Sequence, residues 1–257
     1  MSITAEARLD RNLRQLWELV QHLVVPRLGL RPLALPPALA LASGELEGRR
    51  LTLRTQRYTG PGGAALTLAA IAGEEGRLCT LTVLGIPPLG AGWPVLGIDL
   101  IALRGTLALV AVDLAPLDQP FWQQYCAPLL QALQAQLPDL LVPRKRPGFA
   151  VETFSPLAVI AAARAGSETA VCAAIAELLQ QTTALLAEAP ALAPAAPAAR
   201  ARWLAAERQN RKEHDALSRI FGPRFAAYYL DEFLFAPPEH FSQAAAAPGG
   251  EAGSDVG

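Results

Sequence analysis

The sequence is poor in the residues that build disulfide frameworks and metal centres. It has three cysteines and three histidines in 257 residues. Cys79, Cys126 and Cys172 are far apart, and an odd number of widely spaced cysteines is typical of reduced core thiols rather than of a disulfide-rich secreted domain. The histidines do not cluster with cysteine, which argues against catalytic zinc. We therefore expect no metal site.

The sequence also has few lysines and almost no net charge. Lys145 and Lys212 are the two lysines among 22 basic residues, and the net charge is -1. This balance provides no general attraction to nucleic acid, and the arginines do not alternate with aromatic residues, so no nucleic-acid partner is expected. The glycine-rich turn from Gly60 to Gly63 has neither dinucleotide-binding nor P-loop spacing. No serine has the G-x-S-x-G surroundings of a hydrolase nucleophile.

A long uninterrupted apolar segment is missing as well. The longest stretch without a charged residue, Leu78 to Ile98, contains three prolines and four glycines, which would break a membrane-spanning helix. The charged segment from Met1 to Arg14 does not have the pattern of a secretory signal. We expect a cytoplasmic protein with no membrane partner.

What the chain does have is enough apolar residue, 52%, to bury a large core. Alternation of apolar and polar residues predicts strands at 51–59, 65–72, 78–84, 95–103 and 107–114. Helical spacing predicts helices at 5–25, 122–136, 168–187, 200–220 and 224–234. The segment 151–161 fits either a last strand or the approach to a helix. Short turns between the strands are typical of an antiparallel meander.

This order predicts an α+β fold in which helices cover an antiparallel sheet. We expect a single domain over residues 1–241. The Ala/Gly-rich segment 242–257 is predicted to be a disordered tail.

Two carboxylates lie in apolar strands. Asp99, in Val95-Leu96-Gly97-Ile98-Asp99-Leu100-Ile101, is costly to bury unless it is paired, protonated or facing a cleft. Desolvation would raise its pKa and make it a proton donor near neutral pH, whereas at a strand end it would merely cap a turn. Both interpretations stay open for Asp99. Asp113 ends a strand shortly before Pro116, which favours a turn-capping role.

A polar segment, Arg208 to Asp215, lies on a predicted helix. Its charges are spaced so that they share one or two helix faces. The segment is either a solvated face with ion pairs or a patch that binds ligand carboxylates. His214 could titrate near neutral pH, although a lone surface histidine is the commoner case.

Four motifs in order resemble those of the ferredoxin-dependent bilin reductases. Val95 to Leu100 and Leu109 to Leu117 resemble two core strands of that family, and Phe154-Ser155-Pro156 resembles its F-S-P segment. The closing part resembles the family's end in three pieces, Gln209-Asn210, Leu217 to Gly222 and Tyr229 to Phe235. The order extends from about residue 51 to residue 235.

The resemblance implies a three-layer α/β/α sandwich with a central antiparallel sheet. An open-chain tetrapyrrole, biliverdin or dihydrobiliverdin, would bind between the sheet and the C-terminal helices. The enzyme would be a monomer with no bound metal, flavin or nicotinamide. Reduced ferredoxin would supply electrons one at a time, and carboxyl groups would protonate bilin radicals to give a phycobilin. Asp99 falls on the family's sheet aspartate.

Three departures from the family pattern bear on the product. Phycocyanobilin-forming members have a glutamate and a histidine on the two strands before the sheet aspartate, and counting back gives Ala70 and Thr82 here. The helix aspartate about ten residues before the F-G phenylalanine falls on Arg211. The resemblance is therefore closer to the phycoerythrobilin-forming branch.

The resemblance also assigns candidate site residues. Asp99 is the main proton donor, and His214 or Asp215 would replace the missing helix aspartate. Lys212 matches a basic residue that pairs with a propionate, and Arg211 would do the same or contact ferredoxin. Further bilin contacts are expected at Asn210, Phe154 and Ser155. A basic surface for acidic ferredoxin is expected from Arg144, Lys145, Arg146, Arg200, Arg202 and Arg208, although scattered arginines also simply keep an apolar protein in solution.

Two other functions stay open at this stage. A bilin-binding relative without reductase activity would act as a carrier or chaperone, as the loss of carboxylates at Ala70, Thr82 and Arg211 suggests. Alternatively, the motif matches arise by chance, and the chain is an interaction protein that binds no bilin.

Overall fold

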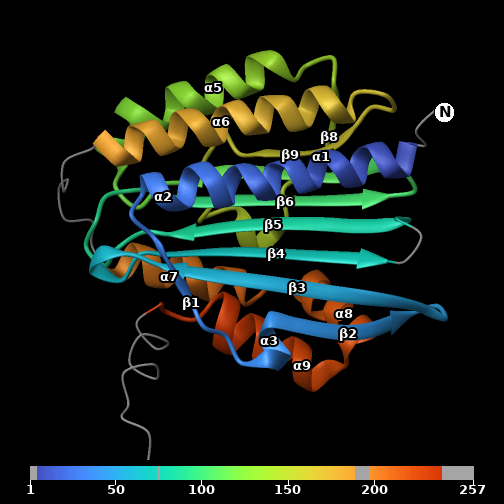
Figure 1. Cartoon of the computed structure of the whole chain (residues 1–257). Helices are drawn as coiled ribbons and strands as arrows, with labels where there is room; N and C mark the ends of the chain where they lie inside the picture. Colours follow the sequence, from blue (N-terminus) through green and yellow to red (C-terminus); the bar gives the residue numbers. More distant parts are fainter. Residues whose placement is uncertain (1–4, 74–75, 189–196, 239–257) are drawn as a thin grey trace, which may run out of the picture.

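The computed structural model describes residues 5–73, 76–188 and 197–238 (Figure 1). Within these residues lies one antiparallel sheet of nine strands in the order β1-β3-β4-β5-β6-β7-β9-β8, with β2 paired to β3. The strands are β1 (Arg31–Leu33), β2 (Leu41–Leu46), β3 (Arg49–Thr59), β4 (Ala65–Gly73), β5 (Leu78–Ile86), β6 (Val95–Leu103), β7 (Thr106–Ala115), β8 (Leu141–Pro143) and β9 (Val159–Ala163).

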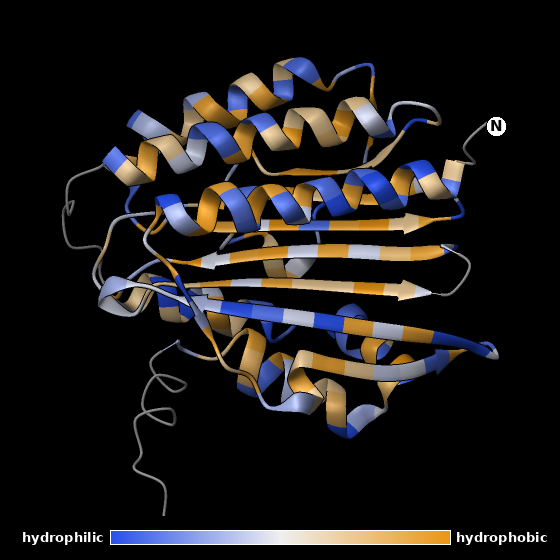
Figure 2. Cartoon of the chain, viewed as in Figure 1, coloured by the Kyte–Doolittle hydropathy of each residue, from blue (hydrophilic) through white to orange (hydrophobic). Residues whose placement is uncertain are grey.

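One face of the sheet is covered by helices from the first three quarters of the chain. They are α1 (Ala5–Leu19), η1 (Val20–Val24), α2 (Val25–Arg27), α4 (Gln119–Phe121), η3 (Trp122–Cys126), α5 (Ala127–Gln136) and α6 (Glu168–Glu188). Their apolar faces, orange in Figure 2, pack on Leu68, Leu81 and Ile98 of the central strands. By length and composition α6 could cross a membrane, but half of its most apolar window is buried in this core.

The other face carries the C-terminal helices α7 (Pro197–Glu207), α8 (Arg211–Phe221), α9 (Pro223–Ala227) and η5 (Tyr228–Leu234), seen below the sheet in Figure 1. Leu53, Ala69 and Leu84 of the sheet pack there against Trp203 and Phe233. The short segments α3 (Pro37–Ala40), η2 (Pro61–Gly63) and η4 (Gly148–Ala150) complete the fold. This arrangement confirms the predicted α+β sandwich with helices on both faces of an antiparallel sheet.

The end of α8 packs closely on β2. A Cβ built on Gly44 would collide with the backbone carbonyl of Ile220 and would lie 2.7 Å from Cδ1 of Phe221. Glycine is therefore required at this point of β2, because any side chain would push α8 away from the sheet.

The five predicted strands are all present, and residues 159–163 are the last strand rather than the approach to a helix. The short strands β1, β2 and β8 had no clear alternation in the sequence, and β1 contains Pro32, as edge strands often do. The predicted helix over 200–220 is wrong as one element, because α7 and α8 are separate. The predicted tail at 242–257 lies outside the described residues.

Candidate functional site

The two faces of the central strands differ in exposure. Toward α1, α5 and α6 the side chains of β5 and β6 from Cys79 to Val83 and from Leu96 to Leu100 are buried at every second position. On the opposite face the alternate residues are only half-buried. They are Thr80, Thr82, Gly97, Asp99, Ile101, Leu109, Ala111 and Ile160. We call this surface the open floor; the C-terminal core packs instead on β3, β4 and the ends of β5, β6 and β7.

The middle of the open floor is made of small residues, among them Thr82, Gly97 and Ala111. A Cβ built on Gly97 would have no heavy atom within 4 Å. Gly97 lies opposite Leu84 on β5 and opposite Asp113 on β7, so this space is in the centre of the sheet rather than at its edge. There is therefore free space directly above Gly97 on this face of the sheet.

Asp99 stands in the middle of the open floor. It pairs with Thr82 on β5 and Ala111 on β7, and the hydroxyl of Thr82 donates a 3.0 Å hydrogen bond to Oδ1 of Asp99. Burial raises the pKa of Asp99 to about 6, although the Thr82 bond lowers it. A mid-strand position excludes the turn-capping interpretation. Asp99 is thus a carboxyl that both holds and releases a proton near neutral pH.

Asp113 is buried and serves a different purpose. The backbone N–H of Ser155 donates to its Oδ2 at 2.8 Å and the Ser155 hydroxyl to its Oδ1 at 2.5 Å. Burial raises the pKa of Asp113 to about 6 against these two bonds. The predicted turn-capping role of Asp113 is wrong, because Asp113 lies inside β7 and its carboxyl group accepts from Ser155, 42 residues away.

The hydrogen bonds between Ser155 and Asp113 hold the F-S-P segment in position. Ser155 is fully buried and its hydroxyl is engaged by Asp113, so the structure makes it a support for the carboxylate. Phe154 stacks edge-on against Phe149 at 6.1 Å between ring centroids and packs on the C-terminal core. Arg146 donates to the carbonyl of Ser155 at 2.7 Å and lowers the pKa of Asp113.

The polar segment predicted to be one helix contains a turn instead. The N–H groups of Gln209 and Asn210 donate to the carbonyls of Ala206 and Glu207, and α8 begins at Arg211. In a continuous helix, two residues six apart would point about 120° away from each other. The turn lets both Glu207 and Glu213 face the sheet.

Glu213 and Glu207 are the functional candidates that sequence reasoning missed. Asn210 donates to Oε2 of Glu213 at 3.1 Å. Burial, and then the charge of Asp99, raise the pKa of Glu213 to about 8. Glu207 is 6% exposed, and burial followed by the charges of Glu213, Asp99 and Asp113 raises its pKa well above the usual value. The sequence held one indication of their burial. Glu207 lies four residues after Trp203 and Glu213 four residues before Leu217, so each glutamate shares a helix face with a core residue.

The other residues predicted on this helix lie elsewhere. Arg211, Lys212 and Asp215 are exposed. His214 is half-buried, and its Nε2 lies 3.2 Å from Oδ1 of Asp231 in η5. The helix face that approaches Asp99 is therefore that of Glu213, not that of His214 or Asp215.

Strand register corrects one of the predicted correspondences. Thr82 pairs with Ala69 on β4, so Thr55, Ala69, Thr82 and Asp99 share one row on one face. Ala70 points to the opposite face, where it packs against the N-terminal core. Ala69, and not Ala70, is thus the residue of β4 that lies beside Thr82 on the face of Asp99. Neither Ala69 nor Thr82 carries a carboxyl or imidazole.

The predicted ferredoxin-facing residues divide into two groups. Arg144, Lys145 and Arg202 are exposed. The others point inward and bond to backbone carbonyls: Arg146 to Ser155, Arg200 to Pro87 and Arg208 to Phe235.

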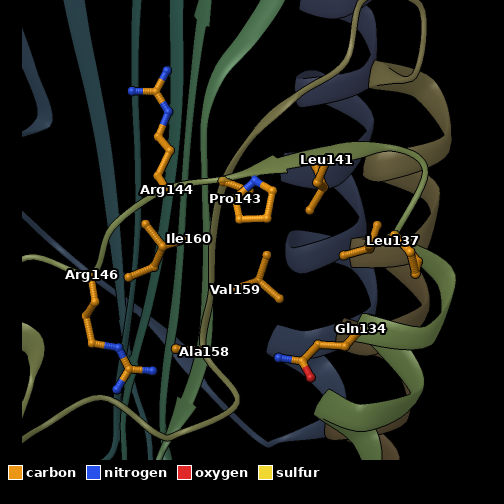
Figure 3. Close-up of a pocket in the computed structure, with 11 residues that line it drawn as sticks. Gln134, Leu137, Leu141, Pro143, Arg144, Arg146, Ala158, Val159 and Ile160 are labelled. Carbon is orange, nitrogen blue, oxygen red and sulfur yellow. The ribbon is translucent and has the colours of Figure 1, made fainter.

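A separate cavity of about 320 Å³ lies between α5 and the β8–β9 edge (Figure 3). Leu137, Leu141 and Val159 line it together with Gln134, and in Figure 3 the guanidinium groups of Arg144 and Arg146 point away from these residues. Its lining has no carboxyl or thiol group. In the part of the chain that the structure describes, three or more His, Cys, Asp or Glu side chains nowhere gather as metal ligands would.

Comparison with known proteins agrees with this geometry. A sequence model described as ferredoxin-dependent bilin reductase matches residues 18–236. A phycocyanobilin:ferredoxin oxidoreductase from Trichodesmium erythraeum (strain IMS101) is 28% identical over 220 residues, which are 82% of this chain and 87% of that protein. A crystal structure of selenomethionine phytochromobilin synthase from tomato in complex with biliverdin has the same fold, with a TM-score of 0.68 and 16% identity over 89% of this chain and 84% of that one. The family match excludes a chance resemblance, and the chain belongs to the ferredoxin-dependent bilin reductases, a family of bilin oxidoreductases.

Proposed function

We propose that this chain reduces biliverdin or dihydrobiliverdin to a phycobilin with electrons from reduced ferredoxin. The observation that carries the proposal is the open floor with Asp99 at its centre. A conjugated tetrapyrrole is broad and planar, and we place one of its faces over Gly97, where a Cβ would meet no heavy atom within 4 Å. The N–H and lactam groups of the ligand would then meet the Asp99 carboxyl.

Asp99 and Glu213 are the proposed proton donors. Reduction of one double bond requires two electrons and two protons. The first electron from ferredoxin makes a bilin radical, and the second reduces that radical to a closed-shell product. Each of the two protons leaves a carboxyl group, which becomes a carboxylate. Because the pKa of Glu213 is raised to about 8, Glu213 holds its proton at neutral pH, whereas Asp99, with a pKa raised to about 6, is protonated there in a minor fraction of molecules. Glu213 thus supplies, two residues later, the helix carboxyl that is missing at Arg211.

Exposed cations beside the site fit the ligand and the partner. Arg211 and Lys212 begin α8, directly before Glu213, and are suited to bind the propionates of a bilin. Arg144 and Lys145 are exposed on the loop after β8 and are suited to contact an acidic ferredoxin. His214, which pairs with Asp231, is assigned to holding α8 against η5.

The product is proposed to be of the phycoerythrobilin type rather than phycocyanobilin. In the row beside Asp99, Ala69 has no polar side chain and Thr82 has a hydroxyl that does not serve as an acid near neutral pH. A vinyl group above β4 and β5 would therefore meet no proton donor on those two strands, and Asp99 on β6 would be the nearest carboxyl in this row. A cytoplasmic monomer without a bound cofactor or a membrane partner stays a prediction.

An anaerobic absorbance time course tests the proposal. The full chain is mixed separately with biliverdin and dihydrobiliverdin in the presence of a reducing ferredoxin system. We expect a bound-bilin spectrum that converts to a product absorbing at shorter wavelength, and the identity of the product defines the reaction. A bound spectrum that never changes would show a carrier instead of a reductase. No spectral change with either bilin would contradict bilin binding itself.

A further inference from the structure

Asp113 borders the free space above Gly97. The two residues are paired across β6 and β7, so they are direct neighbours on one face of the sheet. The Cβ positions of such a pair lie about 4.5–5.5 Å apart. This spacing agrees with the absence of any heavy atom within 4 Å of a Cβ built on Gly97. A ligand that fills the space above Gly97 therefore comes directly beside the Asp113 side chain.

Asp99 lies farther from Asp113 than this space does. Asp99 is paired with Ala111, two residues before Asp113, so Asp99 and Asp113 are diagonal neighbours on the same face. Diagonal neighbours are about 7–8 Å apart. Because an electrostatic interaction weakens with distance, a charge on Asp113 acts more strongly on a ligand above Gly97 than on the Asp99 carboxyl.

The hydrogen bonds of Asp113 favour its ionised form. Ser155 donates to both carboxyl oxygens, from its N–H at 2.8 Å and from its hydroxyl at 2.5 Å. Arg146, which donates to the carbonyl of Ser155 at 2.7 Å, and the N–H of Leu114 also lower the pKa of Asp113. Burial acts in the opposite direction and raises this pKa to about 6, so the group is mostly ionised at neutral pH. Ser155 is fully buried and Asp113 is 4% exposed, which fixes the carboxylate in place.

Other titratable groups face Asp113 from the elements around it. The charge of Asp113 acts on Cys126 in η3 and on Glu207 in α7. Burial raises the pKa of the Cys126 thiol to about 12 and that of Glu207 well above its usual value, so both groups are neutral at neutral pH. Arg146, after β8, is positively charged, and Asp99 lies on β6. Asp113 thus supplies a constant negative charge beside the free space, whereas the charge of Asp99 changes as it loses and regains its proton.

We infer that Asp113 is a fixed negative charge that stabilises the protonated, cationic bilin and so promotes proton transfer to it from Asp99. This inference rests on the proposed function. The proton leaves the Asp99 carboxyl, which becomes a carboxylate, and binds the imine nitrogen of the bilin, which becomes a cation. No electron moves in this step, and the electron from ferredoxin then reduces the cation to a neutral radical. The transfer brings the positive charge closer to Asp113, which is why the carboxylate favours it.

An absorbance titration of bound biliverdin tests the inference without turnover. Protonation of a conjugated tetrapyrrole shifts its long-wavelength band to the red, so a titration of the full chain with biliverdin between about pH 5 and pH 9 gives the pKa of the bound bilin. In Asp113→Asn we expect this pKa to fall by about one to two pH units. Ser155→Ala keeps the carboxylate but removes one donor, and should lower the pKa by less. The matched control is Asp118→Asn, because Asp118 accepts from the N–H of Phe121 at 2.8 Å in α4, which covers the opposite face of the sheet.

Single turnovers with reduced ferredoxin test whether the charge is used. Because one unit of pKa is a tenfold change in the protonated fraction of the bilin, Asp113→Asn should slow the first protonation by about tenfold or more above the wild-type pKa of the bilin. Below the pKa of the bilin in the variant, both proteins hold protonated bilin and the rates should converge. A merely structural role of Asp113 would lower the rate equally at every pH.

The outcomes separate the inference from the proposed function. An unchanged pKa of biliverdin bound to folded Asp113→Asn would overturn the inference. If thermal denaturation shows that this variant does not fold, an unchanged pKa in Ser155→Ala would overturn it instead. A wild type that binds biliverdin but never turns over would contradict the reductase function, while the titration would still decide whether Asp113 stabilises the cation. A wild type that binds no bilin would contradict both.

Discussion

The hydroxyl of Thr82 donates a 3.0 Å hydrogen bond to the carboxyl group of Asp99 across the neighbouring strands β5 and β6. This bond opposes the effect of burial, which raises the pKa of Asp99 to about 6. The balance keeps Asp99 from becoming a permanently neutral acid. It can therefore lose a proton to a ligand and regain one near physiological pH.

Removing this bond should shift the pH dependence of turnover. In Thr82→Val the ionised form of Asp99 loses its hydrogen bond, so the pKa of Asp99 rises. Because Asp99 acts in its protonated form, activity should persist to higher pH, by up to about one pH unit. Thr80→Val is the control, since Thr80 lies on the same strand and face but bonds to the N–H of Ile71. An unchanged profile in Thr82→Val would contradict the coupling.

Replacing the acid itself should separate binding from chemistry. Asp99→Asn keeps the shape of the side chain and can still interact with Thr82, so the fold and bilin binding should be retained. Without the proton, turnover should stop or halt at a radical, with a rate reduced by about 10²-fold or more. Anaerobic absorbance and electron paramagnetic resonance measure these species. Wild-type turnover in this variant would refute the role of Asp99.

The cluster also predicts how stability depends on pH. Burial raises the pKa of Glu213 to about 8 and those of Asp99 and Asp113 to about 6, whereas unfolded carboxyls titrate near about 4. Between these values the folded chain binds more protons than the unfolded chain. The free energy of unfolding should therefore fall as the pH rises from about 4 to about 8.

Glu213→Gln should flatten this dependence. At about pH 8 the variant should be more stable than the wild type by on the order of 2 kcal/mol, after allowance for the partial exposure of the side chain. Chemical denaturation at about pH 5.5 and pH 8 measures the difference, and Glu177→Gln is the control. Equal slopes for Glu213→Gln and the wild type would show that Glu213 titrates normally.

The sequence was sufficient for the five long strands and for the face on which Asp99 lies, because both depend on local alternation. A carboxylate at every-second-residue spacing within Val95 to Ile101 has to share a face with Gly97. Glu207 and Glu213 could not be found in this way. Their common direction depends on the turn at 208–210, and tertiary packing there overrides a helical pattern that is otherwise continuous.

The register of the strands and the hydrogen-bond partners of the side chains also could not be predicted from local sequence patterns. Whether Ala69 or Ala70 lies beside Thr82 depends on how two strands align across the turn between them. Ser155 contacts Asp113 from 42 residues away, and no spacing rule connects them. Arg146 and Arg208 look like surface cations in the sequence, yet both donate to backbone carbonyls.

Charge at the start of α8 should control binding of the propionates. Arg211→Ala removes an exposed guanidinium without disturbing the core. We expect weaker binding of biliverdin, by about three- to tenfold, and little effect on its dimethyl ester, which has no propionate charge. Arg202→Ala, an exposed arginine on α7, is the control. Absorbance titration measures both affinities, and equal losses for acid and ester would exclude Arg211 as a propionate contact.

The space above Gly97 gives the most direct test of where the ligand lies. A Cβ there meets no heavy atom within 4 Å, and the backbone of Gly97 is not in the left-handed region. Gly97→Ala should therefore leave stability unchanged or slightly raise it, because glycine is unfavourable inside a strand. Gly97→Leu extends a branched side chain over the floor and should reduce biliverdin affinity by about tenfold or more while the chain stays folded.

Substitutions at Gly44 and Gly97 distinguish loss of bilin binding through obstruction of the open floor from loss of binding through damage to the fold. At Gly44 even one Cβ collides with Ile220, so Gly44→Ala should lower the thermal midpoint, while any loss of bilin binding should follow the loss of folded protein. Gly97→Leu should have the opposite effect: biliverdin binding is lost while the thermal midpoint is unchanged. If Gly97→Leu binds biliverdin as tightly as the wild type, the ligand does not lie over the centre of β6. Asp99, two residues away on the same face, could then act as the donor only toward a ligand that lies on the side of Asp99 away from Gly97.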